Sequence, residues 1–102
     1  MPLNIKQIGW SFSAELGVAT NVVTTSPGTL HGFLIETDGT NYVTVQCYNH
    51  ASAATNPMTP SIVVPGTDRY GGVVGLGAAF LNGCVCVVSG TGAVVTVYYR
   101  LR

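Results

Sequence analysis

Apolar and polar residues alternate with a period of two along much of the chain, which is the period of a β-strand with one buried face. In residues 42–48, Val43, Val45 and Cys47 alternate with polar or aromatic neighbours, and the same alternation predicts that these three, Cys84, Cys86, Val95 and Val97 are buried. No long stripe of period 3.6 indicates an amphipathic helix, and the many Val, Thr and Gly residues favour strands and turns. The expected strands are 17–24, 30–37, 42–48, 61–64, 84–89 and 93–101, with glycine-rich 70–81 holding either a bulged strand or a loop plus a strand.

Turn residues separate these segments at regular intervals. Pro and Gly preset or permit the backbone angles of tight turns, and Asp-Gly or Asn-Gly pairs favour two-residue hairpins. Such signals occur at 25–28, at Asp38-Gly39, at Asn82-Gly83 and at 90–92, and the polar segment 49–60 is expected to be a long loop. The sequence therefore predicts an all-β domain over 16–102, a β-sandwich of jelly-roll type with seven or eight short antiparallel strands.

Residues 1–15 precede the regular spacing and carry Ile8, Trp10 and Phe12 on one side at period two. This segment is either the first core strand or an extended arm that packs on a neighbouring chain, as an added strand does. The arm hypothesis makes Ile8, Trp10 and Phe12 interface residues, because tryptophan is favoured at interface hot spots. A chain that begins near Leu16 would separate the two, by failing to bind its partner or by failing to fold.

Charge is unusually sparse. Charged residues make up 8% of the chain and the net charge is zero, whereas soluble domains average about 25% charged residues. Such a neutral surface suits self-association or docking on a large assembly, although a small β-domain can also simply be neutral. The cations are too few for the basic stripe of a nucleic-acid binder, no apolar run approaches the roughly 20 residues of a spanning helix, and the first residues lack the apolar core of a secretory signal. We therefore expect synthesis in a cytoplasm, no nucleic acid and no membrane.

The three cysteines, Cys47, Cys84 and Cys86, are expected to be free and buried, because free Cys is among the most buried residue types. The alternative is a zinc site formed by these thiols and His50, which would supply the four ligands of a tetrahedral site. Against zinc, Cys84 and Cys86 lie within a β-branched run rather than in a tight knuckle. We expect no metal and no cofactor.

Catalytic candidates are weak. His31 and His50 are the only histidines, and no serine sits in an elbow motif that would make a nucleophile. Glu36 and Asp38 have the spacing of a carboxylate pair, but they adjoin the Asp38-Gly39 turn, where acidic residues serve turn geometry. We therefore expect that the protein is not an enzyme.

The last strand ends in Tyr98, Tyr99 and Arg100. Adjacent strand residues point to opposite faces, so one tyrosine is expected in the core and one outside. An exposed tyrosine beside an arginine could contact a protein or a sugar, and Tyr99 and Arg100 are taken as interface candidates. The simpler interpretation is an edge aromatic that covers the sheet.

Two stretches, 28–48 and 79–100, resemble small virion proteins of tailed bacteriophages. The shared features are the turn at Phe80–Gly83, the segment Val85–Gly92 and the closing strand Val95–Tyr99, with an opening strand like GTLHGFLIE. Cys84 and Cys86 depart from the pattern, where aliphatic residues are commoner. The resemblance implies a virion component. We expect a capsid decoration protein that forms a homotrimer and docks on the major capsid protein at the outer shell. The alternative is a tail or fibre module that binds a host glycan or a neighbouring tail protein.

Overall fold

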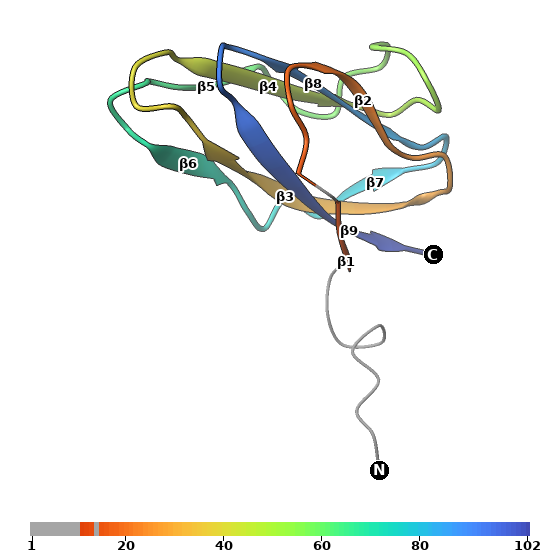
Figure 1. Cartoon of the computed structure of the whole chain (residues 1–102). Coiled ribbons are helices and arrows are strands. Elements are labelled where there is room, and N and C mark those ends of the chain that lie inside the picture. Colours follow the sequence, from red (N-terminus) through yellow and green to blue (C-terminus); the bar gives the residue numbers. More distant parts are fainter. Residues whose placement is uncertain (1–10, 14) are drawn as a thin grey trace.

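The computed structural model describes residues 11–13 and 15–102, which form nine antiparallel strands in two sheets and no helix (Figure 1). This architecture confirms the predicted all-β sandwich. The strands are β1 (Ser11–Phe12), β2 (Ala19–Thr24), β3 (Gly28–Glu36), β4 (Val43–Tyr48), β5 (Ile62–Val64), β6 (Tyr70–Val73), β7 (Ala78–Phe80), β8 (Cys84–Ser89) and β9 (Val94–Leu101).

The strand order is that of a jelly roll. Sheet A has the order β1-β9-β3-β6, with β7 also paired to β3, and sheet B has the order β2-β8-β4-β5. Without β7, eight strands divide equally between two facing sheets, as in other jelly rolls. The ninth strand arises because the glycine-rich segment 70–81 contains two short strands, β6 and β7, that pair with different parts of β3.

The predicted hairpins at Asp38-Gly39 and Asn82-Gly83 are wrong. The first turn joins β3 in sheet A to β4 in sheet B, and the second joins β7 in sheet A to β8 in sheet B. Both glycines do adopt positive φ, 90° at Gly39 and 130° at Gly83, so the chain reverses where expected. Turn chemistry fixes the reversal, but it does not decide whether the next strand pairs with the previous one or crosses to the other sheet.

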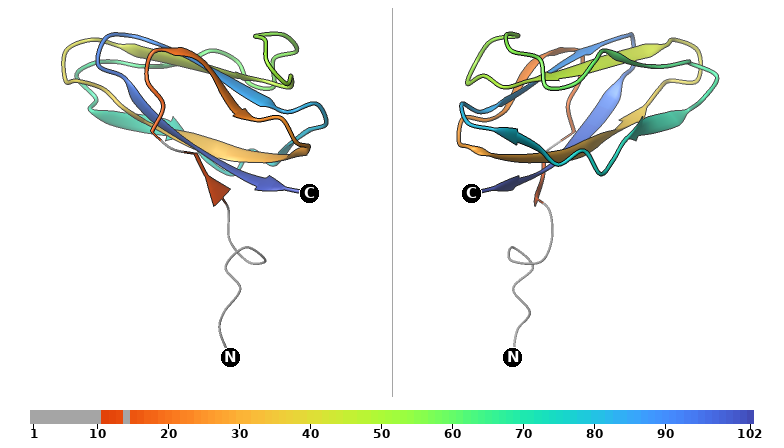
Figure 2. Two further views of the ribbon diagram at one scale, coloured as in Figure 1. Left: turned by 45° about the vertical axis from the view of Figure 1, so that its right-hand side comes forward. Right: turned by 180° about the vertical axis from the view of Figure 1, so that it is seen from behind.

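The core lies between the sheets, which remain separate layers in both views of Figure 2. The alternation predicted that seven side chains would be buried, and all seven are 0% exposed, which confirms the assignment: Val43, Val45, Cys47, Cys84, Cys86, Val95 and Val97. Phe33 from β3 and Phe80 from β7 add the largest apolar volumes.

Residues after β1 continue along the edge of β9. The Ser13 N–H donates to Val97 O (2.8 Å), the Ser13 hydroxyl accepts from Val97 N (2.9 Å), and Leu16 forms a bridge with Val95. Paired in this way, β9 is no longer an open edge of sheet A, which protects it from uncontrolled pairing with other chains.

Candidate functional site: the outer face of sheet A

The outer face of sheet A is built from three strands whose registers align their outward side chains. In β3, Leu34 and Glu36 point outward while Ile35 between them is buried. Leu34 lies opposite Thr96 of β9 and Gly72 of β6. Two residues further along β3, Glu36 lies opposite Val94 of β9 and Tyr70 of β6.

These pairs form parallel rows across the sheet. The row Val94–Glu36–Tyr70 spans three strands, about 10 Å at the usual strand spacing, and the row Thr96–Leu34–Gly72 runs beside it. Beyond that row, Tyr98 lies opposite Gly32. In the middle row only Leu34 is large, because Thr96 is small and Gly72 has no side chain, whereas the flanking rows carry the longer tyrosine side chains.

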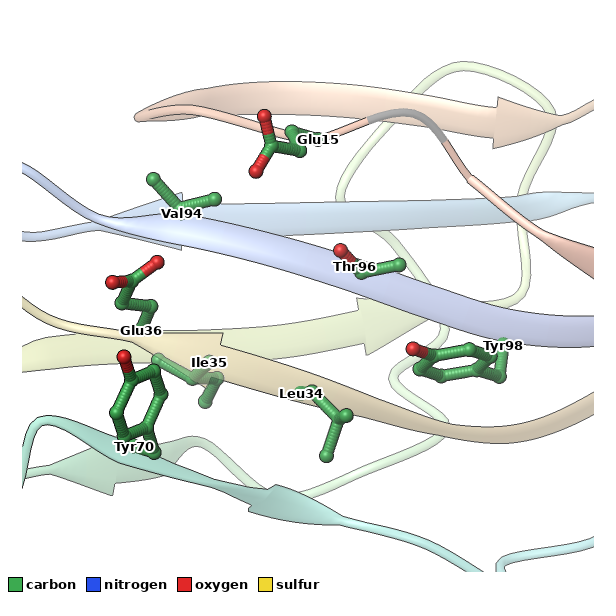
Figure 3. Close-up of a pocket in the computed structure, with 8 residues that line it drawn as sticks. All are labelled: Glu15, Leu34, Ile35, Glu36, Tyr70, Val94, Thr96 and Tyr98. Atoms are coloured by element: carbon green, nitrogen blue, oxygen red, sulfur yellow. The ribbon is translucent and has the colours of Figure 1, made fainter.

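This difference in height leaves a shallow groove of about 210 Å³. Figure 3 shows its lining side chains, with the carboxylates of Glu15 and Glu36 on either side of Val94 and the Tyr70 ring next to Glu36. The lining comprises Glu15, Leu34, Ile35, Glu36, Tyr70, Val94, Thr96 and Tyr98.

The close approach of backbone at Gly72 keeps that position of the middle row free of a side chain. A Cβ on Gly72 would lie 2.2 Å from the carbonyl oxygen of Phe33, and the residue has φ +143°. Only glycine fits both constraints, so the depression is a consequence of how β6 meets β3.

Exposed aromatic rings extend this face beyond the groove. Tyr70 is 70% exposed and Phe12 is 69% exposed. Phe12 lies opposite Tyr98 across the β1–β9 pair, with ring centroids 6.3 Å apart at 50°, a tilted arrangement that aromatic pairs favour. Leu34, 47% exposed, lies between the two groups, so exposed apolar side chains occur on β1, β9, β3 and β6.

The charge of the groove has one sign. Among the described residues, its lining includes two glutamates and no lysine, arginine or histidine. Among the residues that the structure describes, neither glutamate carboxylate has a hydrogen-bonded or ion-paired partner. The groove is therefore an aromatic and aliphatic surface carrying two uncompensated carboxylates.

The predicted interface residues are only partly brought together. Phe12 lies on this face, whereas Ile8 and Trp10 are outside the described residues. Tyr99, the interface candidate, packs against the core cluster. The tyrosine that lines the outer groove is Tyr98. The alternation along this strand predicts an inward Tyr99, because Val95 and Val97 point inward and Tyr99 is two residues beyond Val97. Arg100 is exposed at the end of β9.

The thiols and His50 do not converge on a metal centre. Cys47 lies opposite Cys86, with the two Sγ atoms 3.5 Å apart, and all three cysteines are free and buried. Hydrogen bonding with Cys84 and Cys86, together with burial, raises the pKa of the Cys47 thiol. The Nδ1 of His50 instead accepts backbone hydrogen bonds from Ser52 (3.0 Å) and Ala53 (2.9 Å). Over the described ranges, no group of three or more potential ligands could hold a metal ion.

Glu36 and Asp38 have separate roles. The Asp38 carboxylate accepts hydrogen bonds from the backbone N–H groups of Asn41 (2.8 Å) and Thr40 (2.9 Å) and from the Asn41 amide (2.7 Å). These bonds lower the pKa of Asp38 and fix the turn. Glu36 lines the groove without Asp38, so the spacing of the two carboxylates does not produce a shared site.

No family model, curated protein or solved structure matches this chain. The described part of the chain contains no helix that is long and apolar enough to cross a membrane.

Proposed function

We propose that this protein is a structural component of a tailed-phage virion, a capsid decoration protein that docks on the major capsid protein at the outer shell. The docking surface is the outer face of sheet A. The observation that carries the proposal is the set of side chains on that face, with Phe12, Leu34, Tyr70 and Tyr98 presented together. Clustered exposed apolar residues mark surfaces that another molecule covers.

The energetics suit a protein partner. Full burial of a Phe or Leu side chain is worth about 1.5–3 kcal/mol before the costs of association. Phe12 and Leu34 are still 69% and 47% exposed, so most of the gain from Phe12 and about half of that from Leu34 is available to a partner. The low charge of the chain, 8%, keeps the desolvation cost of such a contact small.

The resemblance of 28–48 and 79–100 to small phage virion proteins supports the virion assignment. Within the proposal, residues 1–15 act as an anchoring arm that carries Ile8, Trp10 and Phe12 at period two. Ser11 and Phe12 of this arm pair with β9 as β1, so a truncation that tests the arm keeps them and removes residues 1–10. The decorating unit is a homotrimer, in which closed cyclic symmetry covers strand edges.

One observation favours a second candidate, a tail or fibre module that binds a host glycan. The groove combines the tyrosine rings of Tyr70 and Tyr98 with the carboxylates of Glu15 and Glu36. Sugars present C–H faces that pack on aromatic rings and hydroxyls that donate to carboxylates, so a glycan is chemically compatible with it.

Counting copies per particle separates the two candidates. Quantitative mass spectrometry of purified virions, with the major capsid protein as internal reference, should find hundreds of copies for a decoration protein. A handful of copies, removed together with the tails, would establish the tail module instead. Absence from the virion would reject both.

A further inference from the structure

We propose that the groove on the outer face of sheet A accepts an arginine side chain of the partner protein. This inference rests on the proposed function in one respect, that the partner is a protein. It adds the chemistry by which the groove selects that partner.

The charge of the groove points to a cation. Glu15 and Glu36 stand on either side of Val94 (Figure 3), and none of the groove residues that the structure describes is basic. Glu36 is half-buried, where water screens its charge less than at the open surface. A cation placed between the two carboxylates would gain charge-assisted hydrogen bonds.

The shape and the aromatic rings favour arginine over lysine. A guanidinium is planar, presents five N–H donors in a fixed fork that matches carboxylates, and stacks on aromatic faces. Tyr70 stands next to Glu36 at one side of the groove, and Tyr98 lies two rows away across the row of Leu34. The aliphatic part of an arginine side chain can cover Leu34 while its head reaches the carboxylates.

The same charges disfavour a second copy of this chain docked face to face. A two-fold contact places the same patch against itself, so the four glutamates of two grooves would meet, and none of the described lining residues is a cation that could offset them. The occupant is therefore a different surface, one that brings positive charge.

A small-molecule titration tests the groove without the virion. N-acetyl-arginine methylamide is titrated into the isotope-labelled full chain, and amide shifts are followed by NMR. The citrulline analogue, equal in shape but neutral, is the matched probe, and the lysine analogue, a methyl glycoside and Ca²⁺ are tested in parallel. We expect saturable shifts at Leu34, Glu36, Tyr70, Thr96 and Tyr98 with the arginine probe, and at least tenfold weaker binding of the citrulline probe, the scale of one charge-assisted hydrogen bond.

Matched variants locate the effect. Glu36→Gln should weaken the arginine probe about tenfold, whereas Asp68→Asn removes an exposed carboxylate outside the groove and should leave binding unchanged. Tyr70→Ala should also weaken it, and Tyr42→Ala, which removes a tyrosine of similar exposure (65%) elsewhere, should not. Backbone spectra report whether each variant is folded.

Several results would overturn the inference: equal binding of the arginine and citrulline probes, equal binding of the lysine probe, no effect of Glu36→Gln, or shifts at these residues caused by the glycoside or Ca²⁺ instead. Its failure is distinguishable from failure of the proposed function. If Glu36→Gln virions keep full copy number, the arginine contact is wrong and decoration stands; if the arginine probe binds but the chain is absent from heads, decoration is wrong.

Discussion

Val97 offers the sharpest test of the packing that supports this face. It lies in the middle of β9, is 0% exposed, and stands opposite Phe33 of β3. Val97→Ala removes two buried carbon groups, each worth about 0.8 kcal/mol in transfer free energy. The cavity that remains adds up to about 1 kcal/mol, at roughly 24 cal/mol per Å³ and about 40 Å³ for the lost groups.

The expected loss in the free energy of unfolding is therefore about 2–3 kcal/mol. The matched control is Val63→Ala in β5, where the same side chain is 57% exposed. Both substitutions remove the same two carbon groups, so their difference reports chiefly how far the side chain is buried. Val63→Ala should cost about 0.5 kcal/mol or less.

Urea unfolding of the three proteins, followed by circular dichroism, gives both midpoints and slopes. With unchanged slopes, the midpoint of Val97→Ala should fall well below that of Val63→Ala. If the two variants are destabilised equally, the inward assignment of this β9 face is refuted, and with it the outward assignment of Thr96 and Tyr98.

Four further outcomes follow from the structure. Gly72→Ala should cost about 2 kcal/mol or more in unfolding free energy because its Cβ would meet the Phe33 carbonyl, whereas Gly17→Ala, with nothing within 4 Å, should stay within about 0.5 kcal/mol; equal effects would contradict the close approach. The three cysteines should react with a thiol reagent only after unfolding without reductant, and a titre below three would show a disulfide or a bound metal. Light scattering of the free protein, or a reconstruction of the particle, should show a homotrimer. A monomer in solution together with isolated copies on the particle would reject it. A chain that starts at Ser11 and so retains β1 should unfold at the same midpoint as the full chain but fail to bind capsids; unfolding or aggregation of this chain would instead give residues 1–10 a role in the fold.

The sequence predicted the fold well where local alternation decides the structure. Val43, Val45 and Cys47 could be assigned to the core because each is flanked by more polar neighbours, and burial on one face imposes that period. The same rule placed Val95 and Val97 correctly and, applied one step further, would have turned Tyr99 inward. The sheet partners were not predictable in this way, since Asp38-Gly39 and Asn82-Gly83 reverse the chain equally well within a sheet or between sheets.

The groove could not be predicted from the sequence, because it depends on long-range register. Glu36 was recognised as a candidate only beside its sequence neighbour Asp38, whereas the structure places it next to Tyr70 and Val94. The sequence of residues 70–73 alone does not show that β6 pairs with β3. It also does not show that Gly72 lies opposite Leu34 and leaves space beside it. Glu15, which completes the groove, comes from the connection between β1 and β2.

The most direct test of the central proposal is a cryo-electron microscopy reconstruction of the virion at a resolution that separates β-strands. The proposal predicts a jelly roll on the outer shell of the head, with sheet A facing the capsid and Phe12, Leu34 and Tyr70 covered by the major capsid protein. A jelly roll located at the tail, or bound to the head with the outer face of sheet A turned to solvent, would contradict it.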